Sequence, residues 1–208
     1  MSKMEVIKTY YESNMGKGLP DFSVLGWESE EAQRLRFDVL MSSSNLEDKR
    51  ILDVGCGMGN LLEYMNERNV NCSYTGVDIL QCMIDSAKSK NLKADFHCLD
   101  IFKDKPFQNE SFDLIYASGI FNLNLGNNKE FLFNALNLFL DLSSSIVAFN
   151  LLHSDSPNKE DQYYYFHPDD VKQIVEEISD RVQKINIVEH YLQNDFTVIL
   201  YKDSKISS

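Results

Sequence analysis

The sequence lacks long apolar runs, paired cysteines and clustered histidines, and each absence argues against a class of protein. No apolar run approaches the roughly 20 residues that a membrane-spanning helix needs. The N-terminal stretch carries Lys and Glu in place of the apolar core of a signal peptide, so we expect a cytoplasmic protein that does not cross a membrane. Only four cysteines are present and no two form a CxxC pair, so we expect reduced thiols. The four histidines are equally scattered, and we expect no metal site.

Positive charge is also scarce. The chain has 20 Lys and Arg against 32 Asp and Glu, which gives a formal net charge of −12. So acidic a surface repels phosphate backbones and anionic headgroups, and the only dense basic stretch, residues 103–105, is short. We therefore expect neither nucleic acid nor a membrane surface as a partner. Apolar surface is abundant, because 13 Phe and 10 Tyr are present, and this excludes disorder of the whole chain.

From residue 50 onward, short β-type runs alternate with helical patterns. The expected strands are residues 50–54, 73–78, 94–99, 112–117, 145–150, 182–188 and 196–201. Apolar residues recur at helical spacing in residues 58–65, 80–87, 131–142 and 168–178. The last two strands are separated by a short connection, which fits an antiparallel hairpin. The pattern predicts an α/β fold, in which helices cover both faces of a mainly parallel sheet.

The first 45 residues do not follow this alternation. They contain a turn-rich segment with Gly16, Gly18 and Pro20, followed by a helical stretch near residues 28–40. The segment is too short for a core of its own. We therefore predict an N-terminal cap, residues 1–45, laid on a single globular domain of residues 46–208.

A glycine-rich turn follows the first strand and is the strongest local signal. Residues 51–60 read ILDVGCGMGN, and Gly55 and Gly57 allow a sharp turn and the close approach of a ligand to the backbone. A dinucleotide-binding loop would read GxGxxG, but here Asn60 stands where the last glycine would fall. Asp53, just before the turn, is unfavourable beside a pyrophosphate and suits a ligand that carries an ammonium group.

Acidic residues follow the next two strands. Asp78 lies about 20 residues beyond the glycines, where an acid accepts hydrogen bonds from ribose hydroxyls. Asp100 can accept a hydrogen bond from an adenine amino group, with Ile101 against the ring. Structural alternatives stay open: the glycines can serve the turn alone, and Asp78 and Asp100 can cap the helices that follow them.

Together these residues resemble the class I S-adenosylmethionine-dependent methyltransferases. The match covers about residues 46–202 and includes the loop DVGCGMG at 53–59, GVD at 76–78, Asp100 and FDLIYAS at 112–118. The resemblance implies a Rossmann-like sheet of seven strands in the order 3-2-1-4-5-7-6, with strand 7 antiparallel. It also implies S-adenosylmethionine as methyl donor and S-adenosylhomocysteine as product.

The resemblance also implies roles for individual residues. The methionine part of the cofactor would lie against Asp53, Gly55, Cys56 and Gly57. The adenosine would lie against Asp78, Ile79, Met83, Asp100 and Ile101, and Ser118 would lie near the transferable methyl group. Arg34 or Arg36 would reach the cofactor carboxylate, unless both are ordinary solvated helix charges.

The sequence gives fewer signals for the methyl acceptor than for the cofactor. Enzymes of this family that methylate amino groups of nucleobases or glutamine often carry an NPPY-like tetrapeptide after the fourth strand, where this chain reads ASGIFN at 117–122. We predict direct displacement onto a small-molecule acceptor, with His153 as candidate base and Asn122 and Tyr116 as further candidates. Further candidate contacts are Tyr10, Tyr11, Trp27, Asn124, Asn150, Asp155, Tyr163, Tyr164, Tyr165 and His167.

Other functions stay open from the sequence alone. They are methylation of a protein or of tRNA, a non-catalytic cofactor-binding subunit, and a nicotinamide-dependent oxidoreductase. The sequence does not determine the oligomeric state.

Overall fold

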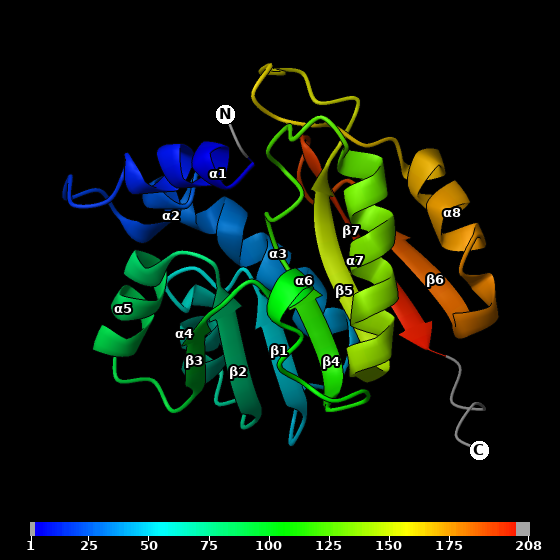
Figure 1. Ribbon diagram of the computed structural model, residues 1–208, viewed down its shortest axis with the longest axis horizontal. Helices are drawn as coiled ribbons and strands as arrows, with labels where there is room; N and C mark the ends of the chain where they lie inside the picture. Colours follow the sequence, from blue (N-terminus) through cyan, green and yellow to red (C-terminus); the bar gives the residue numbers. More distant parts are fainter. Residues whose placement is uncertain (1–2, 203–208) are drawn as a thin grey trace.

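The computed structural model describes residues 3–202, and within them it contains one sheet of seven strands (Figure 1). In their order across the sheet, the strands are β3 (Asp95–Cys98), β2 (Ser73–Asp78), β1 (Arg50–Val54), β4 (Phe112–Ala117), β5 (Ser143–Leu152), β7 (Asp195–Lys202) and β6 (Val182–Val188). Neighbouring strands from β3 to β5 pair in parallel, whereas β7 is antiparallel to both β5 and β6. The expected order and the single antiparallel strand are confirmed.

Helices cover both faces of this sheet. They are α1 (Lys3–Glu12), α2 (Asp21–Val24), α3 (Glu30–Ser43), α4 (Asn60–Glu67), α5 (Gln81–Ser89), α6 (Ile101–Asp104), α7 (Asn128–Leu142) and α8 (Pro168–Glu176), with a 3-10 turn, η1 (Ser179–Arg181). One apolar cluster joins the sheet to α7 and α8, and a second joins the opposite face to α3, α4 and α5. Because both faces are covered, β1 is buried along its length except for Arg50.

Two helices begin where the sequence offers the right capping groups. The Ser29 hydroxyl accepts a hydrogen bond from the Ala32 amide at 3.0 Å and starts α3. The Nδ1 atom of His167 accepts one from the Asp169 amide at 3.1 Å, and Pro168 occupies the first position of α8. His167 therefore has a capping role.

The segment before α3 contains a helix, α1, that the sequence pattern did not predict. Its residues Met4, Ile7 and Tyr11 are spaced for one helical face, and Ile7 and Tyr11 pack against an apolar cluster that includes Leu80 and Met83. None of the α1 residues is fully buried. Figure 1 shows α1 above the carboxyl ends of β1 and β2. The helix depends on contacts with residues far along the chain, which local periodicity does not reveal.

A buried ion pair joins α3 to the start of β7. Arg36 is only 2% exposed, and its Nε and Nη2 atoms donate to Oδ2 of Asp195 at 2.8 and 2.6 Å. Arg34, on the outer side of the same helix, instead pairs with Glu30 and Glu67 at the surface. Both sequence-based alternatives for Arg36 are therefore wrong. Arg36 is not a solvated helix charge, and it points at Asp195 and not at a cofactor site.

None of the helices within residues 3–202 has the length and apolar character needed to cross a bilayer.

The buried pair leads to a stability prediction. Arg36→Met leaves the Asp195 carboxyl buried without its cation, so we expect the free energy of unfolding to fall by about 3–5 kcal/mol. Urea denaturation followed by circular dichroism measures the change. Arg34→Met is the control, because exposed ion pairs contribute little, and its unfolding midpoint should stay close to that of the parent protein. Equal losses in the two variants would contradict a special role for the buried pair.

Candidate active site

A cavity of about 460 Å³ opens at the carboxyl ends of the central strands. Loops after β1, β2, β3 and β4 form its floor, and α1 and the segment around Trp27 form its outer wall. All the residues predicted from the sequence to contact the cofactor line it: Asp53, Gly55, Cys56, Gly57, Asp78, Ile79, Met83, Asp100, Ile101 and Ser118. Tyr116 and Asn122, two of the three catalytic candidates, line it as well.

The glycine turn after β1 is held against β2. The amides of Gly55 and Cys56 both donate to the Val77 carbonyl, at 2.8 and 3.0 Å. Gly55 has φ +75°, and a Cβ atom built on it would lie 2.3 Å from Cγ2 of Ile120. A side chain at this position would therefore be strained and would also collide with Ile120 in the loop after β4. Glycine therefore allows both the turn and the packing of Ile120 against it.

Asp53 is a buried acid beside this turn. It is 4% exposed, lies between Gly76 of β2 and Tyr116 of β4, and accepts a hydrogen bond from the Tyr74 hydroxyl. Burial raises the pKa of Asp53 to about 7, against the lowering effect of the Tyr74 hydrogen bond, and the nearby Asp78 raises it further. Within the described chain no Lys or Arg forms an ion pair with Asp53. A cationic ligand group would therefore find an acid that has no competing cation.

Asp78 and Asp100 combine a local structural role with a place in the cavity wall. The two oxygens of Asp78 accept hydrogen bonds from the amides of Gly57 at 3.0 Å and Leu80 at 2.9 Å. Burial raises the pKa of Asp78, and these backbone donors oppose the rise. Asp100 accepts a hydrogen bond from the Phe102 amide at 3.2 Å and thereby caps α6. The capping alternative is correct for Asp100, whereas Asp78 bonds to the amide of Leu80 just before α5 and is not the cap of that helix. Both acids line the cavity.

Several buried polar atoms of the cavity lack hydrogen-bond partners in the described structure. They are Oδ1 of Asn60, the hydroxyl of Tyr116, Oγ of Ser118 and Oδ1 of Asn122. The hydroxyls of Tyr116 and Ser118 influence each other, but neither makes a hydrogen bond of normal geometry. Unpaired buried polar atoms are costly, so their gathering in one place indicates a wall built for a polar ligand.

Sequence reasoning missed part of this wall. Lys3, Met4 and Ile7 reach the cavity from α1, and Gln33 reaches it from α3, where it is 5% exposed. The helical spacing of Met4, Ile7 and Tyr11 was a weak signal for α1, and nothing in the sequence marked Gln33. Tyr11 and Trp27, which the sequence suggested as wall residues, do line the cavity.

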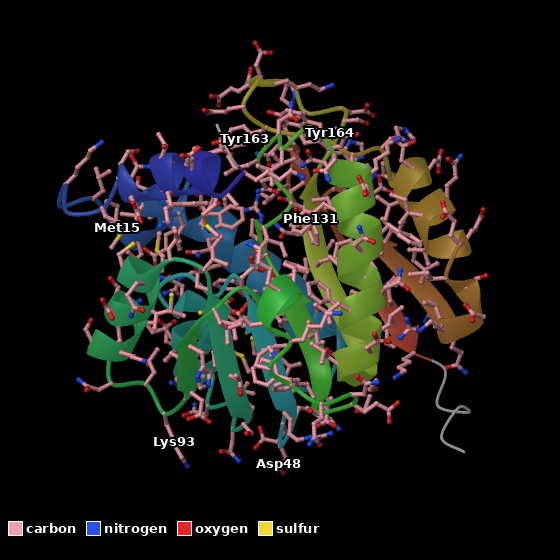
Figure 2. The ribbon with its side chains drawn as sticks, in the orientation of Figure 1. Met15, Asp48, Lys93, Phe131, Tyr163 and Tyr164 are labelled. Carbon is pink, nitrogen blue, oxygen red and sulfur yellow. The ribbon has the colours of Figure 1, made fainter. Side chains whose placement is uncertain are left out.

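Other candidate contacts lie elsewhere. His153 is outside the cavity, where its Nε2 atom lies 3.2 Å from Oε1 of Glu189 and its Nδ1 atom accepts a hydrogen bond from the Asp155 amide. Figure 2 shows Tyr163 and Tyr164 in the loop above the sheet, and the Tyr163 hydroxyl bonds to that of Tyr10 on α1. Across residues 3–202 no group of three or more His, Cys, Asp or Glu could hold a metal ion.

Comparison with known proteins gives a consistent result. A family model described as a methyltransferase domain matches residues 51–139. Rv1506c of Mycobacterium tuberculosis, a protein named as a methyltransferase, is 31% identical over 57% of this chain and 73% of its own length. The trans-aconitate 2-methyltransferase of Delftia acidovorans is 32% identical over 43% of this chain, and the match spans about a third of that protein, 34%.

Solved structures share the whole fold. The magnesium protoporphyrin IX methyltransferase of Synechocystis, crystallised with S-adenosylhomocysteine, superposes with a TM-score of 0.69 over 97% of this chain and all of that chain, at 12% identity. The plantazolicin methyltransferase BpumL, also in complex with S-adenosylhomocysteine, gives a TM-score of 0.67 over 97% of both chains, at 20% identity. At these identities the likeness shows the fold. Together with the sequence relatives, it places this chain among the class I S-adenosylmethionine-dependent methyltransferases.

Proposed function

We propose that this methyltransferase transfers the methyl group of S-adenosylmethionine to a small organic acceptor by direct displacement. The observation that carries the proposal is a single cavity that joins the glycine turn, three acids and four unpaired polar atoms. When bound, S-adenosylmethionine supplies a methyl group that its sulfonium centre makes electrophilic. The protein's task is then to hold donor and acceptor in line and to exclude water.

The residues of the cavity fit the parts of this donor. Asp53, without a cation of its own, suits the amino-acid ammonium, and the backbone of Gly55 and Gly57 lines the cavity beside it. Each Asp78 oxygen accepts one backbone amide and retains capacity for a ribose hydroxyl. Further contacts follow the same prediction: Cys56 at the turn, Ile79 and Met83 against the adenosine, Asp100 and Ile101 at the adenine, and Ser118 near the methyl group.

The rest of the cavity favours a small acceptor with an apolar body. Trp27, Phe37 and Leu123 supply apolar wall, while Gln33 and Asn122 supply neutral polar groups. The volume of about 460 Å³ must serve both donor and acceptor, which favours a compact molecule over a macromolecular segment. The name of one relative agrees, because trans-aconitate is a small molecule. The net charge of −12 disfavours nucleic acid.

The cavity offers no histidine as a base. His153 lies outside it, and no histidine of the described chain lines it. Burial raises the pKa of both Tyr11 and Tyr116, so these phenols remain protonated at neutral pH and can donate a hydrogen bond but not remove a proton. A carboxylate acceptor, which is already ionised at neutral pH, would need no base from the cavity.

The acceptor class is tested with isotopically labelled methyl donor. The enzyme, incubated with the labelled donor and an extract of its native cells, should place label in the small-molecule fraction. An extract from which small molecules have been removed by dialysis should yield no labelled product. Label confined to protein or to RNA would overturn the proposal of a small acceptor while leaving the methyltransferase activity intact.

The assignment of Asp78 to the ribose leads to a second prediction. Asp78→Ala should weaken S-adenosylhomocysteine binding by about 1–3 kcal/mol, because it removes a buried acceptor whose partner then goes unpaired. Isothermal titration calorimetry measures the loss. Asp85→Ala is the control, because Asp85 is an exposed acid of α5 that bonds only to Gln81 in its own helix, and its affinity should match the parent. Parent-like affinity in Asp78→Ala would refute the assignment.

The raised pKa of Asp53 predicts how binding depends on pH. An ammonium group beside Asp53 favours the ionised carboxylate, so the bound protein holds fewer protons than the free protein below pH about 7. Affinity for S-adenosylhomocysteine should therefore rise with pH, by at most about tenfold per unit, and become level above pH about 7. Calorimetry across this range measures the profile.

Two variants make the pH profile diagnostic. Asp53→Asn cannot ionise, so its affinity should be lower and should lose the slope. Tyr74→Phe removes the hydrogen bond that favours the carboxylate and should move the level region to higher pH. A slope that persists in Asp53→Asn would assign it to another group.

A further inference from the structure

Gly119 follows β4 and its backbone is part of the cavity wall. It has φ +86°, and its amide donates to Oδ1 of Asn150 on β5 at 3.0 Å. The neighbouring Ser118 is the residue expected near the transferable methyl group. Asn150 itself is fully buried and does not line the cavity, so it contacts the loop from behind.

The orientation of the Asn150 amide is fixed by Asp195. Its Nδ2 atom donates to both carboxylate oxygens of Asp195, at 3.2 and 3.3 Å, which turns Oδ1 toward Gly119. Tyr191 donates to the same carboxylate at 2.7 Å, and Arg36 donates twice. Reversing the amide would set its oxygen against the carboxylate of Asp195 and its NH₂ group against the Gly119 amide, so Asn150 has one stable orientation.

The same ion pair also positions Trp27. The Arg36 guanidinium lies 4.3 Å from the centre of the Trp27 ring, a favourable cation–π arrangement. The indole also lies against the loop, because a Cβ built on Gly119 would lie 3.2 Å from two atoms of its benzene ring. Two elements of the cavity wall, the Gly119 backbone and the Trp27 ring, therefore depend on one buried cluster.

We propose that Asn150, Asp195 and Arg36 form a positioning cluster that holds Gly119 and Trp27 at the reacting end of the cavity. These residues act through the loop and the indole and do not touch the ligand. The inference rests on the proposed function for the identity of the reacting end. Residues on α3, β5 and β7, outside the cavity, thereby set the shape of the site.

The sequence provides two built-in reporters for a test. Trp27 is the only tryptophan, so intrinsic fluorescence excited at the indole band reports on this position alone. Gly119 is the only glycine that follows a serine, so labelling serine at its carbonyl carbon and glycine at nitrogen selects its amide in an NMR spectrum. Neither signal requires a ligand.

The first measurement is made on the unmodified protein. The Gly119 amide should exchange with solvent at least 100-fold more slowly than an unstructured glycine, because its hydrogen bond to Asn150 is buried. Exchange at the unstructured rate would overturn the proposal without any variant.

The second measurement compares Asn150→Asp with the double variant Asn150→Asp/Asp195→Asn. The single variant keeps an acceptor for Gly119 but places two carboxylates in contact. We expect it to lose Gly119 protection, shift Trp27 emission to longer wavelength and bind S-adenosylhomocysteine at least tenfold more weakly. The double variant restores one carboxylate and one amide, with positions exchanged, and should recover protection, emission and affinity to within threefold.

A third variant tests whether an added charge alone, away from the cluster, changes the three signals. Asn186→Asp adds the same charge on the edge strand β6 and should change none of the three signals. The proposal is overturned if folded Asn150→Asp keeps all three parent signals, or if the folded double variant remains as defective as the single one. If the single variant does not fold, the signals of the double variant and the Gly119 exchange rate of the unmodified protein test the proposal. Parent protein that does not bind S-adenosylhomocysteine would refute the proposed function, whereas the exchange and emission results would stand.

Discussion

The buried pair between Arg36 and Asp195 is the interaction on which the relation between the N-terminal helices and the sheet depends. Removing two charges from water is costly, and such a pair is favourable only when further hydrogen bonds satisfy the remaining donors and acceptors. Here Tyr191, Asn150 and the Ala32 carbonyl satisfy them. The pair can form only when α3 lies in one position against β7, so it selects that position among others that would bury similar apolar area.

The placement of α3 determines the position of one wall of the cavity. Trp27 and Gln33 reach the cavity from the start of α3 and the turn before it, so the wall opposite the glycine turn exists only because α3 is fixed. The floor is determined differently. Asp53, Gly55 and Asp78 stand at the ends of adjacent parallel strands, and the pairing of β1 with β2 brings them together without help from the N-terminal segment. The site thus combines a floor encoded locally with a wall encoded by distant contacts.

This division explains how much could be predicted from the sequence. The strands were accessible because apolar runs are local patterns, and their order followed from the family resemblance. The residues expected to contact the cofactor all line the cavity, and their contacts with it stay predictions. The helix α1, the cavity role of Gln33 and the partner of Arg36 were not, since Arg36 and Asp195 are separated by 159 positions and no local pattern relates them. His153 was a reasonable candidate base by residue type, but its position at the end of β5 directs it toward Glu189. The boundary between a cap and a main domain at residue 45 stays a prediction.

The double role of Asp78 has a consequence for the energetics of ligand association. Its hydrogen bonds to the amides of Gly57 and Leu80 tie the glycine turn to the start of α5 in the protein alone. The turn and the acid are therefore already arranged before any nucleoside arrives, and the entropy of arranging them is lost during folding. Preorganisation of this kind leaves more of the contact energy available for affinity.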